Sequence, residues 1–299
     1  MSKDHLKWVY LLLLALIWGS SFILIKKGLV GLSALQVGSL RVVFAAVFLV
    51  IVGFKTLKKI QHEQWKWLAL SGFFGEFFPA FLFSYAETEI DSGIVAILNS
   101  TTPLLAMLAG IFLFGTKPVK QKIIGVLVGL LGTTALILSG AALNPDQNYW
   151  YSGLVVLASL FYGYNANILK THLQELPALS VTTGSFMVIA VPALVVLCTT
   201  GFFSTETFHE PELALSLLYI AILGIIGTGA AFVIFNKLIQ ISDPVFSTSV
   251  TYLVPIVALG WGVLDGEGFS LFQLFSGLII ILGVLIVNKS RKPKIVDNN

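Results

Sequence analysis

Residues 71–91 read "SGFFGEFFPAFLFSYAETEID", and residues 223–243 read "LGIIGTGAAFVIFNKLIQISD". At a constant offset of 152 residues the two stretches share Gly72 with Gly224, Gly75 with Gly227, Phe83 with Phe235 and Asp91 with Asp243. The same offset carries Pro103 onto Pro255. The chain is therefore built from two copies of one unit, and the character of these stretches decides the fold.

Both stretches lie in apolar blocks that are long enough to cross a bilayer, which takes about 20 mostly apolar residues. The chain has 299 residues, of which 57% are hydrophobic and 11% charged, whereas a soluble domain carries about 25% charged residues. Strands of a membrane barrel would alternate in polarity, and these blocks do not. The sequence predicts an all-α polytopic membrane protein with ten transmembrane helices, at 8–26, 35–54, 65–86, 92–114, 121–140, 150–169, 180–201, 213–236, 244–264 and 270–288.

The repeat extends upstream, where an offset of 144 residues places "WGSSFILIK" (18–26) on "YGYNANILK" (162–170). We therefore predict a first five-helix repeat over 1–142 and a second over 143–299. Five crossings is an odd number, so the second copy must enter the membrane facing the opposite way. Two inverted five-helix repeats are a recurring plan of secondary transporters. The first block is expected to remain as a helix, rather than to be cleaved as a signal, because the sixth block is its partner.

Basic residues predict the orientation in the membrane. With the N-terminus in the cytoplasm, fifteen of the eighteen Lys and Arg residues fall on the cytoplasmic side, and only Lys26 and Lys27 fall outside. Under the positive-inside rule this bias places both termini in the cytoplasm. The net charge of +3 then reflects topology, and we expect no nucleic-acid partner.

Three local segments carry a family resemblance: "LIWGSSFILIK" (16–26), "SLRVVFAAVFL" (39–49) and "ILNSTTPLLAMLAGIFLFG" (97–115). Together with the repeat, they make the chain resemble the EamA-type permeases of the drug/metabolite transporter superfamily. The resemblance implies export or exchange of small metabolites, often amino acids, across the bacterial inner membrane. It also implies a central cavity among spans 1–4 and 6–9, with spans 5 and 10 at the periphery. One departure is Gly115, where family repeats often carry a Glu; its second-half counterpart is Glu267.

Glu76 is the first candidate for chemistry, because it lies about 16 Å into the third span by helix rise. A carboxylate at that depth must face water or a partner. The functional interpretation is a contact to a substrate ammonium or a proton-coupling acid. The structural interpretation is an ion pair between Arg41 and Glu76, since Arg41 lies only about 5 Å away in depth. Both interpretations remain open on the sequence alone.

Two prolines at matched positions predict helix kinks, because each removes a hydrogen bond to the carbonyl four residues back. Interrupted helices at corresponding positions of two halves point to a transporter's binding site. The alternative is that neighbouring hydroxyls simply repair the backbone. The kinks are Pro103 and Pro255, and the candidate binding residues around them are Asn99, Thr101, Thr251 and Tyr252.

The first and sixth spans each present an aromatic and a small polar side chain at i, i+3, which places each pair on one helix face. The pairs are Trp18 with Ser21 and Tyr162 with Asn165. Aromatics and a few amides suit a zwitterion with an apolar side chain. For any single ring, packing in the protein interior is the competing explanation.

These features favour a secondary transporter that exports amino acids or similar small metabolites by alternating access. The chain lacks a phosphate-binding G-x-x-x-x-G-K-[ST] motif, so transport is expected to draw on a proton or counter-solute gradient. We expect no enzyme activity, catalytic residue, metal or cofactor. The alternatives are an efflux transporter for drugs or organic cations and, further away, a lipid scramblase or a membrane protein without transport activity. The glycines at 125 and 129 leave a monomer and a homodimer both open.

Overall fold

The computed structural model describes residues 3–117, 120–141, 148–265 and 271–288, and every regular element in these ranges is helical. The first half holds α1 (Lys3–Gly28), α2 (Ala34–Gly53), α3 (Trp65–Gly72), the π-helical segment η3 (Phe73–Phe77), α4 (Phe78–Ala86), α5 (Ser92–Asn99), α6 (Thr102–Phe114) and α7 (Lys120–Ala141). The second half holds α8 (Ser152–His172), α9 (Ala178–Thr199), α10 (Thr205–Phe208), α11 (Leu213–Ile222), the π-helical segment η5 (Leu223–Ala230), α12 (Ala231–Ile241), α13 (Pro244–Thr248), η6 (Ser249–Tyr252), α14 (Val254–Leu264) and α15 (Leu271–Asn288).

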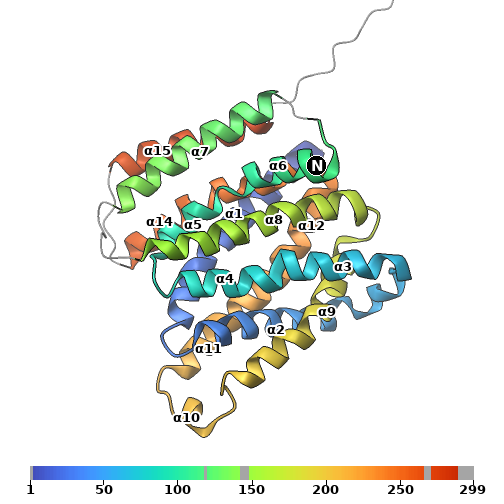
Figure 1. The fold of residues 1–299 in the computed structure, drawn as a ribbon, viewed down its shortest axis with the longest axis vertical. Coiled ribbons are helices and arrows are strands. Elements are labelled where there is room, and N and C mark those ends of the chain that lie inside the picture. Colours follow the sequence, from blue (N-terminus) through green and yellow to red (C-terminus); the bar gives the residue numbers. More distant parts are fainter. Residues whose placement is uncertain (1–2, 118–119, 142–147, 266–270, 289–299) are drawn as a thin grey trace, which may run out of the picture.

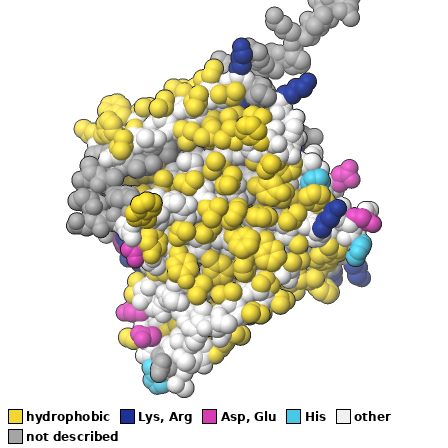
Figure 2. Space-filling model, in the orientation of Figure 1, with side chains coloured by type: hydrophobic (Ala, Val, Ile, Leu, Met, Phe, Trp, Pro, Cys, Tyr) yellow, Lys and Arg dark blue, Asp and Glu magenta, His cyan; other side chains and the backbone are white. Residues whose placement is uncertain are grey.

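Eight helical stretches in the described ranges are long and apolar enough to cross a membrane. Several are composite, because α3, η3 and α4 follow one another without a break, as do α11, η5 and α12. The prediction of an all-helical membrane protein is confirmed. Figure 2 shows hydrophobic side chains covering the broad face of the molecule, with charged side chains towards its edges. This distribution fits a protein whose helices pass side by side through lipid.

Helices α7 and α15 pack against each other at one end of the molecule (Figure 1). Glycines permit their close approach. A Cβ added at Gly283 would lie 2.6 Å from the Gly129 nitrogen, and one at Gly132 would lie 2.8 Å from the Ile280 nitrogen. The glycines that left a homodimer open on the sequence are thus used for packing within one chain.

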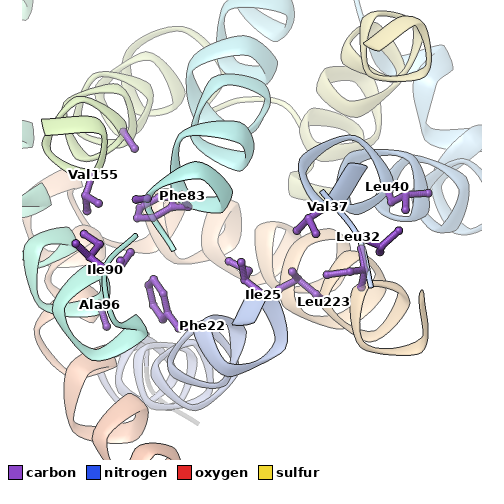
Figure 3. Close-up of a cluster of buried hydrophobic side chains, with 14 of the residues drawn as sticks. Phe22, Ile25, Leu32, Val37, Leu40, Phe83, Ile90, Ala96, Val155 and Leu223 are labelled. Atoms are coloured by element: carbon purple, nitrogen blue, oxygen red, sulfur yellow. The ribbon is translucent and has the colours of Figure 1, made fainter. Parts of the chain in front are cut away.

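Helices α1 and α2 each pack against elements of both halves of the chain. α1 packs against α5, α11, α12 and α14, while α2 packs between α4, α9 and η5. Their buried side chains join a hydrophobic cluster that draws on both halves of the chain; in Figure 3, Ile25 and Val37 lie near Leu223 of η5. Residues distant in sequence therefore meet around these two helices.

The two predicted proline kinks are real breaks. α5 ends at Asn99 before Pro103, and the 3₁₀ segment η6 precedes α14 and Pro255. Hydroxyls cap both freed carbonyls: Thr102 Oγ1 donates to the Asn99 oxygen at 2.6 Å, and Ser100 Oγ donates to the Thr251 oxygen at 2.7 Å. The backbone repair considered from the sequence is thus observed, and these carbonyls are already satisfied.

The backbone conformation at residue 115 explains why a glycine stands there. Gly115 ends α6 with a φ of 63°, in the left-handed region where glycine carries no steric penalty. Its predicted counterpart, Glu267, lies outside the described residues.

Candidate functional site

A cavity of about 50 Å³ lies among the central helices, and its walls come from α1, α2, α4, α5, α6, α8, α12, α13 and η6. Its polar lining residues are Ser21, Arg41, Asn99, Thr102, Tyr162, Asn165, Thr248 and Thr251. Its apolar lining residues are Trp18, Phe22, Ile25, Phe83, Phe232, Phe235 and Val250. No lining residue comes from α7 or α15, which the resemblance placed at the periphery.

The structure brings together six of the nine predicted binding residues. Those lining the cavity are Trp18, Ser21, Asn99, Tyr162, Asn165 and Thr251. Glu76, Thr101 and Tyr252 do not line it. Each of the three has a separate physical reason.

Tyr252 faces α7 instead of the cavity. It is fully buried, its ring packs over Gly129, and its hydroxyl donates to the Val126 oxygen at 3.4 Å. Thr101 lies in the break between α5 and α6 and donates its hydroxyl to the Leu98 oxygen at 2.8 Å. Helical spacing does not run on through a break, so the faces of these segments differ from those expected of a continuous helix.

Glu76 lies behind Arg41. Arg41 Nε is 3.0 Å from Glu76 Oε1 and donates a hydrogen bond to Thr228 Oγ1 at 2.8 Å. Arg41 is 4% exposed and Glu76 1%, and neither Glu76 oxygen has a hydrogen-bond partner. The guanidinium also interacts with the Tyr162 hydroxyl. Because Arg41 lines the cavity and Glu76 does not, the charge that reaches the cavity is positive.

Both π-helical segments lie beside the cavity, and at the 152-residue offset Glu76 of η3 aligns with Thr228 of η5. A side chain packs over the glycine before each of these two residues. Asn165 covers Gly75, which precedes Glu76, and Ser21 covers Gly227, which precedes Thr228. Trp18 Nε1 also donates to the Gly227 oxygen at 3.0 Å. Single π-helical turns in long helices are frequent at functional sites, where they re-aim side chains.

Two further contacts recur at matched positions. A Cβ added at Gly72 would lie 2.8 Å from the Ser185 oxygen of α9, and one at Gly224 would lie 2.9 Å from the Arg41 oxygen of α2. At the 144-residue offset, Arg41 aligns with Ser185. Each span that contains a π-helical segment thus approaches the backbone of a helix from the other half, α9 or α2, and the residues approached, Ser185 and Arg41, are equivalent in the repeat.

Aromatic ring pairs flank the cavity. Phe83 stacks on Tyr162 with ring centroids 5.7 Å apart, and Phe235 tilts against Trp18 at 5.1 Å. Phe22 adds an edge contact to Phe83 at 6.0 Å, and Figure 3 shows these two rings, from α1 and α4, within one buried cluster. An ion pair of 2.8 Å between Lys27 Nζ and Asp265 Oδ1 also joins the C-terminal end of α1 to the end of α14.

A model of the EamA-like transporter family matches residues 6–138 and again 150–289. The chain belongs to the EamA-like transporter family. It is therefore a membrane transporter and not an enzyme. Similar curated proteins include a "Probable amino-acid metabolite efflux pump" of Salmonella typhimurium, 27% identical over 92% of each chain. Others are the "Uncharacterized inner membrane transporter YedA" of Escherichia coli, 26% identical over 92% of this chain and 88% of that one, and the "Uncharacterized transporter YoaV" of Bacillus subtilis, 27% identical over 91% and 92%.

A solved crystal structure has the same fold as this EamA-like chain. It matches with a TM-score of 0.72 and 16% identity, over 96% of this chain and 97% of that one.

Sequence reasoning missed several residues of this EamA-like site. Thr228 was not among the predicted site residues, yet its hydroxyl accepts a hydrogen bond from Arg41. Phe83 and Phe235 were recognised as matched positions but not as cavity walls. Their matching in the repeat, together with their position near the C-terminal ends of their spans, was the signal that could have found them.

Proposed function

We propose that this EamA-like transporter exports small metabolites, amino acids above all, across the bacterial inner membrane by alternating access. The cavity among the central helices carries this proposal. Its walls come from both segments that match the family. Movement of these two segments against each other would open the cavity to one side of the membrane at a time, as alternating access requires.

The inverted repeat of 1–142 and 143–299 is part of the proposal. Two observations support it: the recurrence of the Gly72–Ser185 contact as Gly224–Arg41, and the presence of a π-helical segment at the same place in each half. With five crossings in each half, equivalent contacts lie towards opposite faces of the membrane. When one contact of a pair forms and its equivalent breaks, the cavity would open to one side of the membrane and close to the other.

The two ring pairs are the proposed gates. Phe83 and Phe235 align at the 152-residue offset, and their ring partners Tyr162 and Trp18 align at the 144-residue offset. Separating the Phe83–Tyr162 pair would open the cavity towards the outside. Separating the Phe235–Trp18 pair would open it towards the cytoplasm, where both termini are proposed to lie.

Amino acids are favoured as substrates by the mix of aromatic walls and amide side chains, and by the printed name of the Salmonella relative. An organic cation is disfavoured, because Arg41 is the charged residue among those lining the cavity. A proton or counter-solute gradient would drive the export.

The test is transport by purified protein in proteoliposomes, with a panel of labelled amino acids and tetraphenylphosphonium, with and without a pH gradient. We expect gradient-dependent amino-acid movement and none of the cation. Phe235→Ala should lower the rate, whereas Phe112→Ala, a ring 79% exposed on α6, should leave it unchanged. Movement of the cation alone, or scrambling of a fluorescent lipid without any amino-acid movement, would overturn the proposal.

A further inference from the structure

Resting on the proposed transport function, we infer that Arg41 binds the carboxylate of the substrate while Asn165 Oδ1 accepts its ammonium group. The ligand is a zwitterionic α-amino acid with a bulky apolar side chain. Four observations support this assignment: how Arg41 is held, which acceptor is unpartnered, how the charges balance and what forms the walls.

Arg41 is held from behind. A guanidinium has five N–H donors in a planar fork that fits a carboxylate. The N–H of Nε is donated to Thr228 Oγ1, and Glu76 Oε1 lies 3.0 Å from the same Nε. These contacts lock the orientation of the plane from outside the cavity, since neither Glu76 nor Thr228 lines it. Arg41 also lines the cavity, so its guanidinium can meet a carboxylate there, with Tyr162 beside it.

Asn165 offers a single unpartnered acceptor. The residue is 2% exposed, lines the cavity, and its Oδ1 has no hydrogen-bond partner. A buried acceptor left without a partner is costly and calls for an explanation. Asn99 is not equivalent, because its Oδ1 already accepts from the hydroxyls of Thr102 at 3.1 Å and Ser159 at 3.5 Å.

Charge balance selects a zwitterion. Arg41 and Glu76 form a neutral pair, and net charge is costly in the interior of a membrane protein. A zwitterion keeps the site neutral, whereas an amine or an amino-acid amide adds a positive charge beside Arg41. A carboxylic acid without the amine leaves Asn165 unpartnered and adds a negative charge.

The walls select the side chain. Phe22, Phe83, Phe232 and Phe235 line the cavity together with Ile25. A polar side chain would lose its water without finding partners on these rings, whereas an aliphatic or aromatic one is transferred to a similar environment.

The first experiment needs no variant. Uptake of labelled phenylalanine into proteoliposomes is measured in competition with leucine, phenylalaninamide, phenethylamine and 3-phenylpropionate. We expect leucine to compete, and each of the three analogues to compete at least roughly tenfold less well, since each lacks one charge-assisted contact. If phenylalaninamide competes as well as leucine, the assignment of the carboxylate to Arg41 is overturned. If 3-phenylpropionate competes as well as leucine, the role of Asn165 is overturned.

The second experiment removes both charges at once, because removing one partner alone would leave an unpaired buried charge and destabilise the protein. In Arg41→Gln/Glu76→Gln we expect the preference for phenylalanine over its amide to fall about tenfold or more. Ser185→Ala is the matched control at the equivalent, non-lining position of α9 and should keep the wild-type preference. A purely structural role for Arg41 would change the rate without changing this ratio, and that result would contradict the inference. If the double variant does not reconstitute, the wild-type competition decides.

The two proposals fail separately. Wild-type protein that moves none of these compounds contradicts the transport function. Wild-type protein that moves amino acids, amides and amines alike leaves transport standing and removes only the carboxylate site.

Discussion

Arg41 is the residue on which the centre of this transporter depends. It extends from α2 to Glu76 in η3, Thr228 in η5 and Tyr162 in α8, so four elements meet at one guanidinium. Two of these positions, Glu76 and Thr228, are equivalents in the two halves. A single cation therefore joins the halves at the point where they come together around the cavity.

Glu76→Gln should destabilise the protein strongly. The substitution leaves Arg41 charged, buried and without its counter-ion, and breaking a buried pair in this way costs about 3–5 kcal/mol. The free energy of unfolding, measured by denaturant titration in mixed micelles with tryptophan fluorescence, should fall by that amount. The double variant Arg41→Gln/Glu76→Gln should recover most of the loss. A single variant as stable as the wild type would show that the ion pair does not stabilise the fold.

At the scale of the elements, the two π-helical segments are the distinctive feature. Each occurs in the middle of a long span and holds a polar residue that contacts Arg41. η3 directly follows Gly72 and η5 contains Gly224, the two glycines that approach a carbonyl of the other half. Each glycine lets two helix backbones approach, and the π turn re-aims the polar side chain within the span. Sequence periodicity alone would have assigned plain α-helix to both spans.

Gly72→Ala and Gly224→Ala should each destabilise by about 1–3 kcal/mol, because the new methyl group would press on a backbone carbonyl that cannot move aside. Gly260→Ala is the matched control. It lies in α14 with nothing within 4 Å of an added Cβ, so the higher helix propensity of alanine should make it neutral or slightly stabilising. Unfolding in mixed micelles compares all three. A Gly224→Ala protein that matched Gly260→Ala in stability would contradict the close approach of η5 and α2.

At the scale of the whole molecule, the helices divide into a central group that builds the cavity and a peripheral pair, α7 and α15, that pack on each other (Figure 1). In the proposed mechanism, the two halves of the central group move as units. The repeat supplies a reason why two such arrangements have similar energy, since each half can adopt the conformation of its equivalent.

The proposed inverted arrangement makes a topological prediction. In a Cys198→Ser background, single cysteines at Lys117 and Leu264 should react with a membrane-impermeant maleimide from opposite sides, Lys117 from the cytoplasm and Leu264 from outside. Both positions are exposed: Lys117 follows the end of α6, and Leu264 is the last residue of α14. Labelling is measured in intact cells and in inverted membrane vesicles. Reaction of both cysteines from the same side would refute the inversion, and with it the gating by equivalent ring pairs.

Much of the site was predictable from the sequence because intramembrane polarity is costly, so each polar residue in a span has few acceptable places. Trp18, Ser21, Tyr162 and Asn165 were predicted from i, i+3 spacing, and all four line the cavity. Thr101 and Tyr252 were wrong as lining residues, because spacing does not survive the breaks at the proline kinks. The contact between Arg41 and Thr228 spans 187 residues and has no local signal.

The sequence by itself determined that this chain is a helical membrane protein with a repeated unit. Hydrophobic length and matched glycines are local properties, read one span at a time. Only the tertiary structure decided which charge meets the cavity. Arg41 and Glu76 lie at similar depth in neighbouring spans, and depth is all that position along a helix can reveal. Which of the two side chains faces inward depends on the rotation of each helix, and that rotation is fixed by contacts with helices from the other half of the chain.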